Sequence, residues 1–478
     1  EKNLSKKNKC IVIGGGIGGY TAAIRAARLG GQITLVEQAE IGGTCLNWGC
    51  IPFKLLLQSA SVASTVNKAK EFGIKTGPPE VDYAALISRK NQVVAELRKG
   101  VQSLVKAKRI RLVVGSAELF DGNRVEVTSK KNATASVEEI QSDRVIIATG
   151  SKSSSIPIPG LDKVKAQNSD DFLNSRTMPS STIIIGGGVI GVELAQILNG
   201  LGGSVTILEL QNQVIPGFDK EIADILESEL KQQGVTIIKG VLISGAAMSK
   251  NKLKKIVTFK IDGKEQTISA DEIVVAVGRE PVMSGVSPQK LGLDLNNVPM
   301  KGIKVNCHME TNLSNVYAVG DVTGEIMLAH VASAQAEVAA YNALRDEAAR
   351  PKVMDYKSIP SCVYTSPEVA FVGLTEEQTM KKVDVEVGRF PFSASGKARL
   401  LGEIGGMVKI IADKKYGEVL GVHIIGSRAT DMIAEAVLGM NMEITIDELA
   451  NTVHPHPTLS EGVMEAALSL SGGAIHIP

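Results

Sequence analysis

The chain contains two copies of one glycine-rich unit, and this internal repeat limits its fold more than any other feature. Residues 10–37, CIVIGGGIGGYTAAIRAARLGGQITLVE, align without gaps to residues 182–209, TIIIGGGVIGVELAQILNGLGGSVTILE. In each copy an apolar, β-branched run precedes the glycines, an Ala- and Leu-rich segment follows, and a second apolar run ends in glutamate. This pattern predicts a strand–turn–helix–strand unit in both places.

The glycines of each copy follow the spacing of a phosphate-binding turn. The first glycine permits a tight turn, the second lets a pyrophosphate approach the backbone, and the third packs helix on strand. The helix N-terminus then offers N–H groups to the phosphates. The candidate residues are Gly14, Gly16 and Gly19 in the first copy and Gly186, Gly188 and Gly191 in the second. Two complete copies in one register predict two dinucleotide sites rather than glycine-rich turns without a ligand.

The glutamate that ends each copy is a candidate ribose ligand. Glu37 and Glu209 follow the second apolar run, where a carboxylate can accept hydrogen bonds from ribose hydroxyls. Glu209 would also repel a 2′-phosphate, and no Arg or Lys replaces it at that strand end. The second site is therefore predicted to bind NAD rather than NADP.

Three further apolar runs end in glycine: VIIATG at 145–150, IVVAVGR at 273–279 and VYAVGD at 316–321. One run follows each repeat and is predicted to complete its sheet, which makes Gly150 and Gly278 candidate nucleotide-site residues. Asp321 could accept a hydrogen bond from a polyol or cap a helix, and the sequence leaves both open.

Two of the five cysteines form a close pair in the segment GGTCLNWGCIPFK. Cys45 and Cys50 would point roughly 140° apart on a regular helix, so a bridge between them requires a distorted or newly started one. Gly42, Gly43 and Gly49 would allow that distortion. A helix N-terminus and the nearby Lys54 are expected to lower a thiol pKa. A zinc site is disfavoured because the chain has no second cysteine pair with ligand spacing, and no metal is predicted.

Length and composition describe an ordinary globular chain. Its 478 residues suffice for about three or four domains. With 44% hydrophobic residues, 22% charged residues and a net charge of +1, disorder and nucleic-acid binding are disfavoured. The N-terminal Lys2, Lys6, Lys7 and Lys9 are interpreted as a solvated tail. No apolar run approaches the roughly 20 residues that span a bilayer, and the cysteine usage suggests a cytoplasmic protein, or a mitochondrial-matrix one in a eukaryote.

Taken together, the two repeats, the cysteine segment and the ATG, AVGR and AVGD runs resemble the two-dinucleotide-domain flavoprotein disulfide reductases. The resemblance implies FAD on the first repeat, with Asp321 on the ribitol side, and a pyridine nucleotide on the second. It also implies a Cys45–Cys50 disulfide beside the flavin ring, with Cys50 on the flavin side. Lys54 would lie near the flavin and pair with Glu193.

The same resemblance implies an α/β fold with two Rossmann-like dinucleotide-binding domains and a C-terminal α+β dimerisation domain. The expected domains are an FAD domain with the redox disulfide at 1–150, an NAD domain at 151–279, a central domain completing the FAD site at 280–350 and an interface domain at 351–478.

The segment VHPHPTLSE at 453–461 points to one branch of the family. An imidazole oriented by a carboxylate is a suitable base for a thiol, and the motif is similar to that of the dihydrolipoamide dehydrogenases. By that similarity His456 is the acid–base, Glu461 its orienting partner and His454 local support. In the family the segment serves the other subunit's cysteines, so a homodimer is implied. Glutathione-type reductases need basic residues where Glu209 stands, and mercuric reductases carry a C-terminal cysteine pair that is missing here.

This branch implies NAD-dependent oxidation of protein-bound dihydrolipoamide. The implied partners are the lipoyl domains and E2 core of a 2-oxo acid dehydrogenase, or the H protein of glycine cleavage. A reductase for another disulfide, or a structural subunit docked on a large core, stays open as an alternative. Phe53 and Pro455 depart from the branch's motifs, and Phe53 is expected to alter packing near the flavin.

Overall fold

The computed structural model describes residues 8–131, 134–175, 177–297 and 300–477. Lys2, Lys6 and Lys7 of the predicted tail lie outside these residues. The chain forms two compact units, which are treated separately below. The first contains Glu1–Leu55, Ala84–Ser154 and Arg279–Asp355; the second contains Leu56–Tyr83, Ser155–Gly278 and Tyr356–Pro478.

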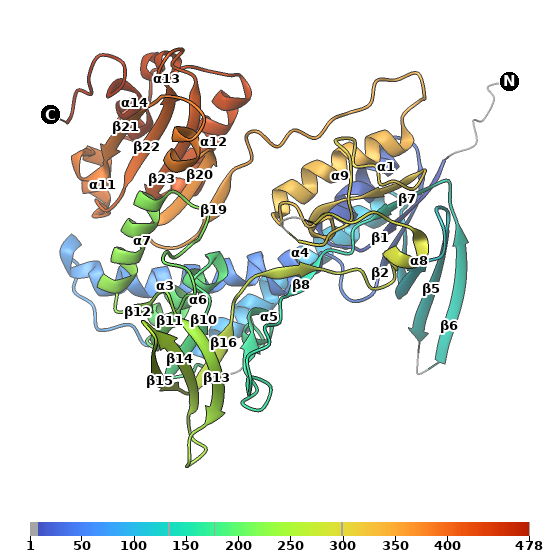
Figure 1. Ribbon diagram of the computed structural model, residues 1–478, viewed down its shortest axis with the longest axis horizontal. Helices are drawn as coiled ribbons and strands as arrows, with labels where there is room; N and C mark the ends of the chain where they lie inside the picture. Colours follow the sequence, from blue (N-terminus) through green and yellow to red (C-terminus); the bar gives the residue numbers. More distant parts are fainter. Residues whose placement is uncertain (1–7, 132–133, 176, 298–299, 478) are drawn as a thin grey trace. The chain divides into compact units, whose positions relative to one another are not determined.

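The first unit is built on a parallel five-stranded sheet, β18-β7-β1-β2-β3 (Figure 1). Its strands are β1 (Lys9–Ile13), β2 (Gln32–Glu37), β3 (Arg111–Val114), β7 (Arg144–Ile147) and β18 (Val316–Ala318). Apolar side chains are buried on both faces of the central strands β1 and β7, as expected for a parallel sheet covered on each side. Helices α1 (Ile17–Arg28) and α9 (Ala329–Leu344) pack against each other beside the sheet.

Smaller elements complete the first unit. An antiparallel sheet joins β4 (Ser116–Leu119), β5 (Arg124–Lys131) and β6 (Thr134–Gln141), and a two-stranded ribbon joins β8 (Ser151–Ser153) to β17 (Arg279–Pro281). Helices α4 (Tyr83–Ala107) and α8 (Pro288–Leu291) and the 3-10 turn η2 (Gly320–Thr323) fill the connections. The core between the sheets is formed by Val, Ile and Leu side chains, among them Val125, Val145 and Val316.

The second unit contains another parallel sheet, ordered β12-β11-β10-β16-β9. Its strands are β9 (Gln167–Asn168), β10 (Ser181–Ile185), β11 (Ser204–Leu208), β12 (Thr236–Ile238) and β16 (Glu272–Val275). Its helices include α5 (Ser169–Phe172), α6 (Val189–Gly200) and α7 (Lys220–Gln232), and an antiparallel sheet joins β13 (Leu242–Met248), β14 (Lys255–Ile261) and β15 (Lys264–Ala270).

The C-terminal part of the second unit is an antiparallel sheet with helices, ordered β19-β20-β23-β22-β21. The strands are β19 (Ser361–Val363), β20 (Glu368–Gly373), β21 (Val385–Pro391), β22 (Met407–Asp413) and β23 (Val419–Gly426). The helices are α10 (Glu376–Met380), α11 (Gly396–Leu401), α12 (Ala429–Asn441), α13 (Ile446–Asn451) and α14 (Glu461–Leu468). One buried cluster, which includes Phe392, Val422 and Ile433, joins the sheet to α12 and α14.

This architecture confirms the predicted fold class: two Rossmann-like parallel sheets and a C-terminal antiparallel domain. The two sequence repeats become β1–α1–β2 and β10–α6–β11, each a parallel strand pair joined by a helix. The boundaries assigned to the four domains stay a prediction. Within the described ranges no helix is both long enough and apolar enough to cross a bilayer.

Candidate active site

The first glycine turn lies between β1 and α1, and only two of its three glycines are required by neighbouring protein atoms. A Cβ on Gly14 would lie 2.2 Å from the carbonyl oxygen of Ala148, and one on Gly19 would lie 1.7 Å from that of Gly14. A Cβ on Gly16 would meet nothing closer than the Cα of Gly43, at 3.8 Å. The protein itself therefore leaves space at the second glycine.

The second turn, between β10 and α6, repeats this arrangement. A Cβ on Gly186 would lie 2.5 Å from the Ala276 carbonyl oxygen, and one on Gly191 would lie 2.0 Å from that of Gly186. Gly188 has no atom within 4 Å of its would-be Cβ. Gly16 and Gly188 are also the N-cap residues of α1 and α6. An open approach to the N-terminus of a long helix, at the carboxyl edge of a parallel sheet, fits the pyrophosphate of a dinucleotide in both repeats.

Each repeat also uses its terminal glutamate in the same way. Glu37 accepts a hydrogen bond from the Gly15 N–H at 2.6 Å and one from the Ala39 N–H at 2.7 Å. Glu209 accepts from the Gly187 N–H at 2.5 Å, and its other oxygen accepts from the residue 211 N–H at 2.7 Å. These bonds hold a buried carboxylate beside each turn, where its remaining lone pairs can accept from ribose hydroxyls.

The cysteine segment is attached to the first turn and contains a break between two helices. The Gly42 N–H donates to the Gly15 carbonyl oxygen at 2.8 Å. Helix α2 (Gly43–Trp48) carries Cys45, and α3 (Cys50–Lys68) begins at Cys50. Gly49 between them has φ −139° and ψ −118°, which is not helical.

Gly49 is also the position where the backbone approaches the first cysteine. A Cβ there would lie 2.9 Å from the Thr44 carbonyl oxygen and 3.3 Å from the Cys45 Cα. Glycine therefore lets the chain fold back, and the side chains of Cys45 and Cys50 come within hydrogen-bonding distance. The distorted helix that the spacing of the cysteines required is present.

The pKa of the Cys45 thiol depends on its neighbours. The hydrogen bond from the Cys45 thiol to Cys50, followed by burial, raises the pKa of Cys45 above its usual value, although the charge of Lys54 and the Cys50 N–H lower it. Lys54 lowers the pKa of this thiol, as expected, but the hydrogen bond and burial outweigh it, so the net pKa of Cys45 is raised. Cys45 keeps its proton and donates it toward Cys50.

Tyr20 is a neighbour of the cysteine pair that the sequence did not single out. It lies on the first turn of α1, and burial, followed by an electrostatic interaction with the nearby Cys45 side chain, raises the pKa of its hydroxyl. The glycine turn, Tyr20, the cysteine pair and Lys54 thus belong to one region of the first unit. The only sequence signal for Tyr20 was its position directly after the third glycine of the turn. Phe53, the departure from the family motif, is buried in α3.

A chain of polar contacts lies at the carboxyl end of the first sheet. The Ser151 hydroxyl donates to Asp321 at 2.5 Å, and the Arg279 guanidinium donates to the Ser151 hydroxyl at 2.8 Å. Burial raises the pKa of Asp321, and the Ser151 and Arg279 contacts only partly offset that effect. Gly150 precedes Ser151 and Gly278 precedes Arg279 in the ribbon-forming segments. Ser151 and Arg279 were not predicted as site residues.

The C-terminal histidine pairs with its predicted glutamate. His456 Nδ1 lies 2.8 Å from Glu461 Oε1, and the Thr458 N–H donates to the other carboxylate oxygen at 2.7 Å. Burial alone would raise the pKa of Glu461, but these two hydrogen bonds and the nearby histidine charges lower it below its usual value. Because an ionised carboxylate only accepts, Nδ1 of His456 donates to Glu461, and Nε2 is the ring nitrogen left for a substrate.

The remaining predicted residues have local partners. The side chain of His454, only 4% exposed, contacts Glu435 through Nε2 at 2.8 Å. Glu193 is buried on α6 and accepts from the Tyr364 N–H at 3.0 Å. Lys54 belongs to the first unit and Glu193 to the second, so their pairing stays a prediction.

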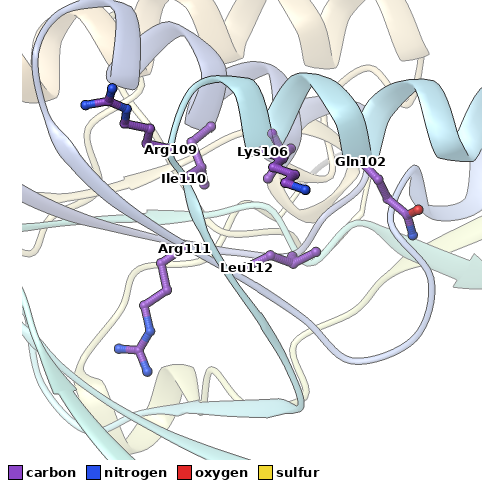
Figure 2. Close-up of a pocket in the computed structure, with 7 residues that line it drawn as sticks. Gln102, Lys106, Arg109, Ile110, Arg111 and Leu112 are labelled. Atoms are coloured by element: carbon purple, nitrogen blue, oxygen red, sulfur yellow. The ribbon is translucent and has the colours of Figure 1, made fainter.

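Two surface hollows lie away from all of these residues. The larger, about 420 Å³, is lined by Gln102 and Lys106 of α4 and by the segment that enters β3 (Figure 2). The smaller, about 210 Å³, lies beside β9 and α5. In the described part of the chain no group of three or more His, Cys, Asp or Glu side chains is placed to hold a metal ion.

Two nucleotide-type turns, a hydrogen-bonded cysteine pair and an imidazole–carboxylate pair define the class of a disulfide oxidoreductase. Residues 8–336 match the family model described as pyridine nucleotide-disulphide oxidoreductase, and residues 359–467 match the dimerisation domain of that family. The chain therefore belongs to the pyridine nucleotide-disulphide oxidoreductase family. It is a flavoprotein disulfide oxidoreductase with Cys45–Cys50 as its redox pair, the family uses FAD and a pyridine nucleotide, and the dimerisation domain supports a homodimer.

Similar proteins cover almost the whole chain. A dihydrolipoyl dehydrogenase of Bacillus subtilis (strain 168) is 39% identical over 475 residues, which is 98% of each chain. A mitochondrial dihydrolipoyl dehydrogenase of Arabidopsis thaliana is 37% identical, covering 99% of this chain and 92% of that one. Among solved structures, the HOCl-induced flavoprotein disulfide reductase RclA from Escherichia coli, in its Cu(II) complex, matches with a TM-score of 0.84 and 28% identity, covering 97% of this chain and 99% of that one.

Proposed function

We propose that the protein oxidises dihydrolipoamide to lipoamide and reduces NAD⁺ to NADH. The observation that carries this proposal is the His456–Glu461 pair, 2.8 Å apart, in a chain that also holds the Cys45–Cys50 pair. A disulfide reductase that starts from a dithiol must remove a thiol proton before sulfur can attack sulfur. An imidazole fixed by a carboxylate supplies that function near neutral pH.

The cysteine pair exchanges two electrons with the substrate. His456 Nε2 accepts the proton of one substrate thiol, and the resulting thiolate attacks Cys45 of the disulfide, which releases Cys50 as a thiolate. The second substrate sulfur then displaces Cys45 and its proton passes to the departing Cys45 sulfur, so the lipoyl disulfide forms, the cysteine pair is reduced and the first proton stays on His456. Cys45 ends with a proton and a hydrogen bond to Cys50, as in the structure. FAD, when bound on the first repeat, supplies the two-electron link between a dithiol and a nicotinamide.

The second repeat is assigned to NAD on the position of Glu209. Both carboxylate oxygens of this residue are held by backbone N–H groups beside the glycine turn, so the negative charge stays fixed at the ribose position. A 2′-phosphate would bring like charge to that place. In the first unit, Asp321 and its Ser151–Arg279 neighbours are assigned to the flavin side chain.

The active protein is assigned as a homodimer in which His456 of one copy serves the cysteine pair of the other. Its partners are assigned as lipoyl domains, either on the E2 core of a 2-oxo acid dehydrogenase or on the H protein of glycine cleavage. Identity of 36–39% to full-length dihydrolipoyl dehydrogenases supports this assignment.

The test is His456→Gln in the FAD-loaded protein. Loss of the general base should slow dihydrolipoamide oxidation about 10²- to 10⁴-fold and leave the bound-flavin spectrum unchanged. His308 offers a control: its Nδ1 lies 2.8 Å from the Lys352 carbonyl oxygen, so His308→Gln removes a hydrogen-bonded imidazole outside the motif. Turnover of His456→Gln at the rate of the control would remove His456 from the mechanism.

A reductase for another disulfide is the second candidate, favoured by the full-length structural match to RclA. A comparison of dihydrolipoamide with NAD⁺ or NADP⁺, and of glutathione disulfide and mercuric ion with NADH or NADPH, separates the two. The proposal expects dihydrolipoamide with NAD⁺ to give a kcat/KM at least about tenfold above every other pair. Preference for a different disulfide, or equal use of NADP⁺, would contradict it.

A further inference from the structure

The loop that leaves the second repeat, residues 210–219 between β11 and α7, passes beside the glycine turn. Its Ile215 N–H donates to the Gly187 carbonyl oxygen at 2.7 Å. Gly187 in turn donates its own N–H to Glu209, at 2.5 Å. The loop therefore contacts the residue immediately before Gly188, where the open approach to α6 begins.

Ile215 holds this contact in a strained conformation. Its φ is +42°, in the left-handed region, and its side chain is 0% exposed. A β-branched residue rarely adopts that conformation, because Cβ crowds the backbone. Such a conformation persists only where the surroundings hold it in place. The structure must therefore fix the loop at more than one point.

The far end of the loop is fixed at Asp219. This residue is 3% exposed and is the N-cap of α7, where it accepts from the Glu221 N–H at 3.1 Å. Its carboxylate also accepts from Lys409 Nζ at 2.9 Å. Lys409 lies on β22 of the C-terminal sheet, and α7 packs against the neighbouring strand β23 (Figure 1).

Lys409 is fully engaged although it is only 1% exposed. Its ammonium group lies 2.9 Å from Asp219, 2.9 Å from Glu221 and 2.7 Å from Glu376, so each of its three protons has a carboxylate acceptor. Burial alone would lower the pKa of Lys409, but the three carboxylates raise it. A buried lysine with three such partners is locked in one position, unlike a surface ion pair.

We propose that Lys409 is a positioning residue for pyridine-nucleotide binding, because it anchors at Asp219 the strained loop that supports the glycine turn at Gly187. The inference rests on the proposed function only in taking the second repeat as the nicotinamide site. Lys409 belongs to the segment that matches the dimerisation domain, so that domain helps to shape the nucleotide site of its own chain. The residue touches neither nucleotide nor substrate.

The experiment compares Lys409→Met with Lys409→Arg and with Lys220→Met. Lys220 is an exposed lysine at the start of α7 that pairs with Asp224, so its variant controls for loss of a lysine ion pair. NADH binding to the FAD-loaded dimer is measured by titration, and flavin reduction by dihydrolipoamide is measured without nucleotide. Lys409→Met should bind NADH about tenfold more weakly, with flavin reduction unchanged; Lys409→Arg should recover part of the loss, and Lys220→Met should match the wild type.

Asp219→Asn provides the result if Lys409→Met does not fold, because it removes the charge but keeps a side-chain cap on α7. It too should weaken NADH binding with flavin reduction intact. NADH binding within twofold of the wild type in the folded variants would overturn the proposal, as would an equal loss of flavin reduction. If the wild type binds NADH but does not oxidise dihydrolipoamide, the proposed function fails while the binding test of Lys409 still stands.

Discussion

Because the space beside Gly188 is open, we expect a substitution there to weaken nucleotide binding without lowering the stability of the protein. Nothing lies within 4 Å of a Cβ built there, and the residue has φ −71° and ψ −176°, which alanine adopts freely. Gly188→Ala should therefore leave the free energy of unfolding unchanged or raise it by about 0.4–1 kcal/mol, because the unfolded chain loses freedom. The new methyl group occupies the path of the pyrophosphate instead.

Nucleotide binding should fall by a calculable amount. If the methyl group keeps the phosphates from one charge-assisted N–H hydrogen bond, the loss is about 1.5–3 kcal/mol. That corresponds to a roughly 10- to 150-fold weaker Kd for NADH. Calorimetric titration of the FAD-loaded protein measures the Kd, and urea unfolding measures the stability.

Gly191→Ala is the matched contrast on the same helix, since its Cβ would lie 2.0 Å from the Gly186 carbonyl oxygen. It should lower the free energy of unfolding by more than about 2 kcal/mol. A Gly188→Ala protein that binds NADH within twofold of the wild type would show that phosphate does not approach the second glycine, and the argument from open space would fail.

Three further predictions concern the same unit. Ile215→Gly should be about 1 kcal/mol more stable than Ile215→Ala in urea unfolding. Both variants lose the isoleucine side chain, but only alanine is strained at φ +42°. An alanine variant at least as stable as the glycine variant would show that no strain exists. Glu209→Gln should raise kcat/KM for NADPH, relative to kcat/KM for NADH, about tenfold. The 2′-phosphate then no longer meets a negative charge, while the amide oxygen can still accept from Gly187. An unchanged ratio would refute the electrostatic account of selectivity. Burial alone would raise the pKa values of Asp219 and Glu221, but Lys409 lowers both and Arg389 also lowers that of Glu221. The contribution of these carboxylates to stability is therefore present above about pH 4.5 and is lost as pH falls through the lowered values. In Lys409→Met the effect of burial on the two carboxyl pKa values is less opposed, so these pKa values should be higher than in the wild type. Acidification toward about pH 4 should therefore lower the stability of the wild type more than that of the variant. Equal acid unfolding curves would contradict this.

Patterns local in the sequence predicted their structures well. The gapless repeat predicted two strand–helix–strand units, since the alternation of apolar strand, glycine turn and apolar helix is complete within each copy. The spacing of Cys45 and Cys50 predicted a broken helix, because two side chains five residues apart cannot meet on a regular one. The break occurs at Gly49, one of the three glycines expected to permit it.

Contacts between distant segments could not be predicted in this way. The Arg279–Ser151–Asp321 chain joins three segments that are far apart in sequence. Lys409 on β22 likewise meets carboxylates at α7 and α10, which are distant from it in the chain. The net pKa of Cys45 could not be predicted for a related reason. Lys54 was visible in the sequence, whereas the Cys45–Cys50 hydrogen bond that outweighs it depends on the fold at Gly49.

The two glutamate-tied turns have a consequence for how such a protein can be altered. Glu37 and Glu209 accept hydrogen bonds from equivalent backbone N–H groups, so both turns are held in the same way. The segments beside the two turns differ: the cysteine segment contacts the first turn through Gly42, and the Ile215 loop contacts the second through Gly187. A duplicated unit can thus diverge toward a new ligand by keeping its glycines and terminal glutamate while its other residues and the adjoining segments change.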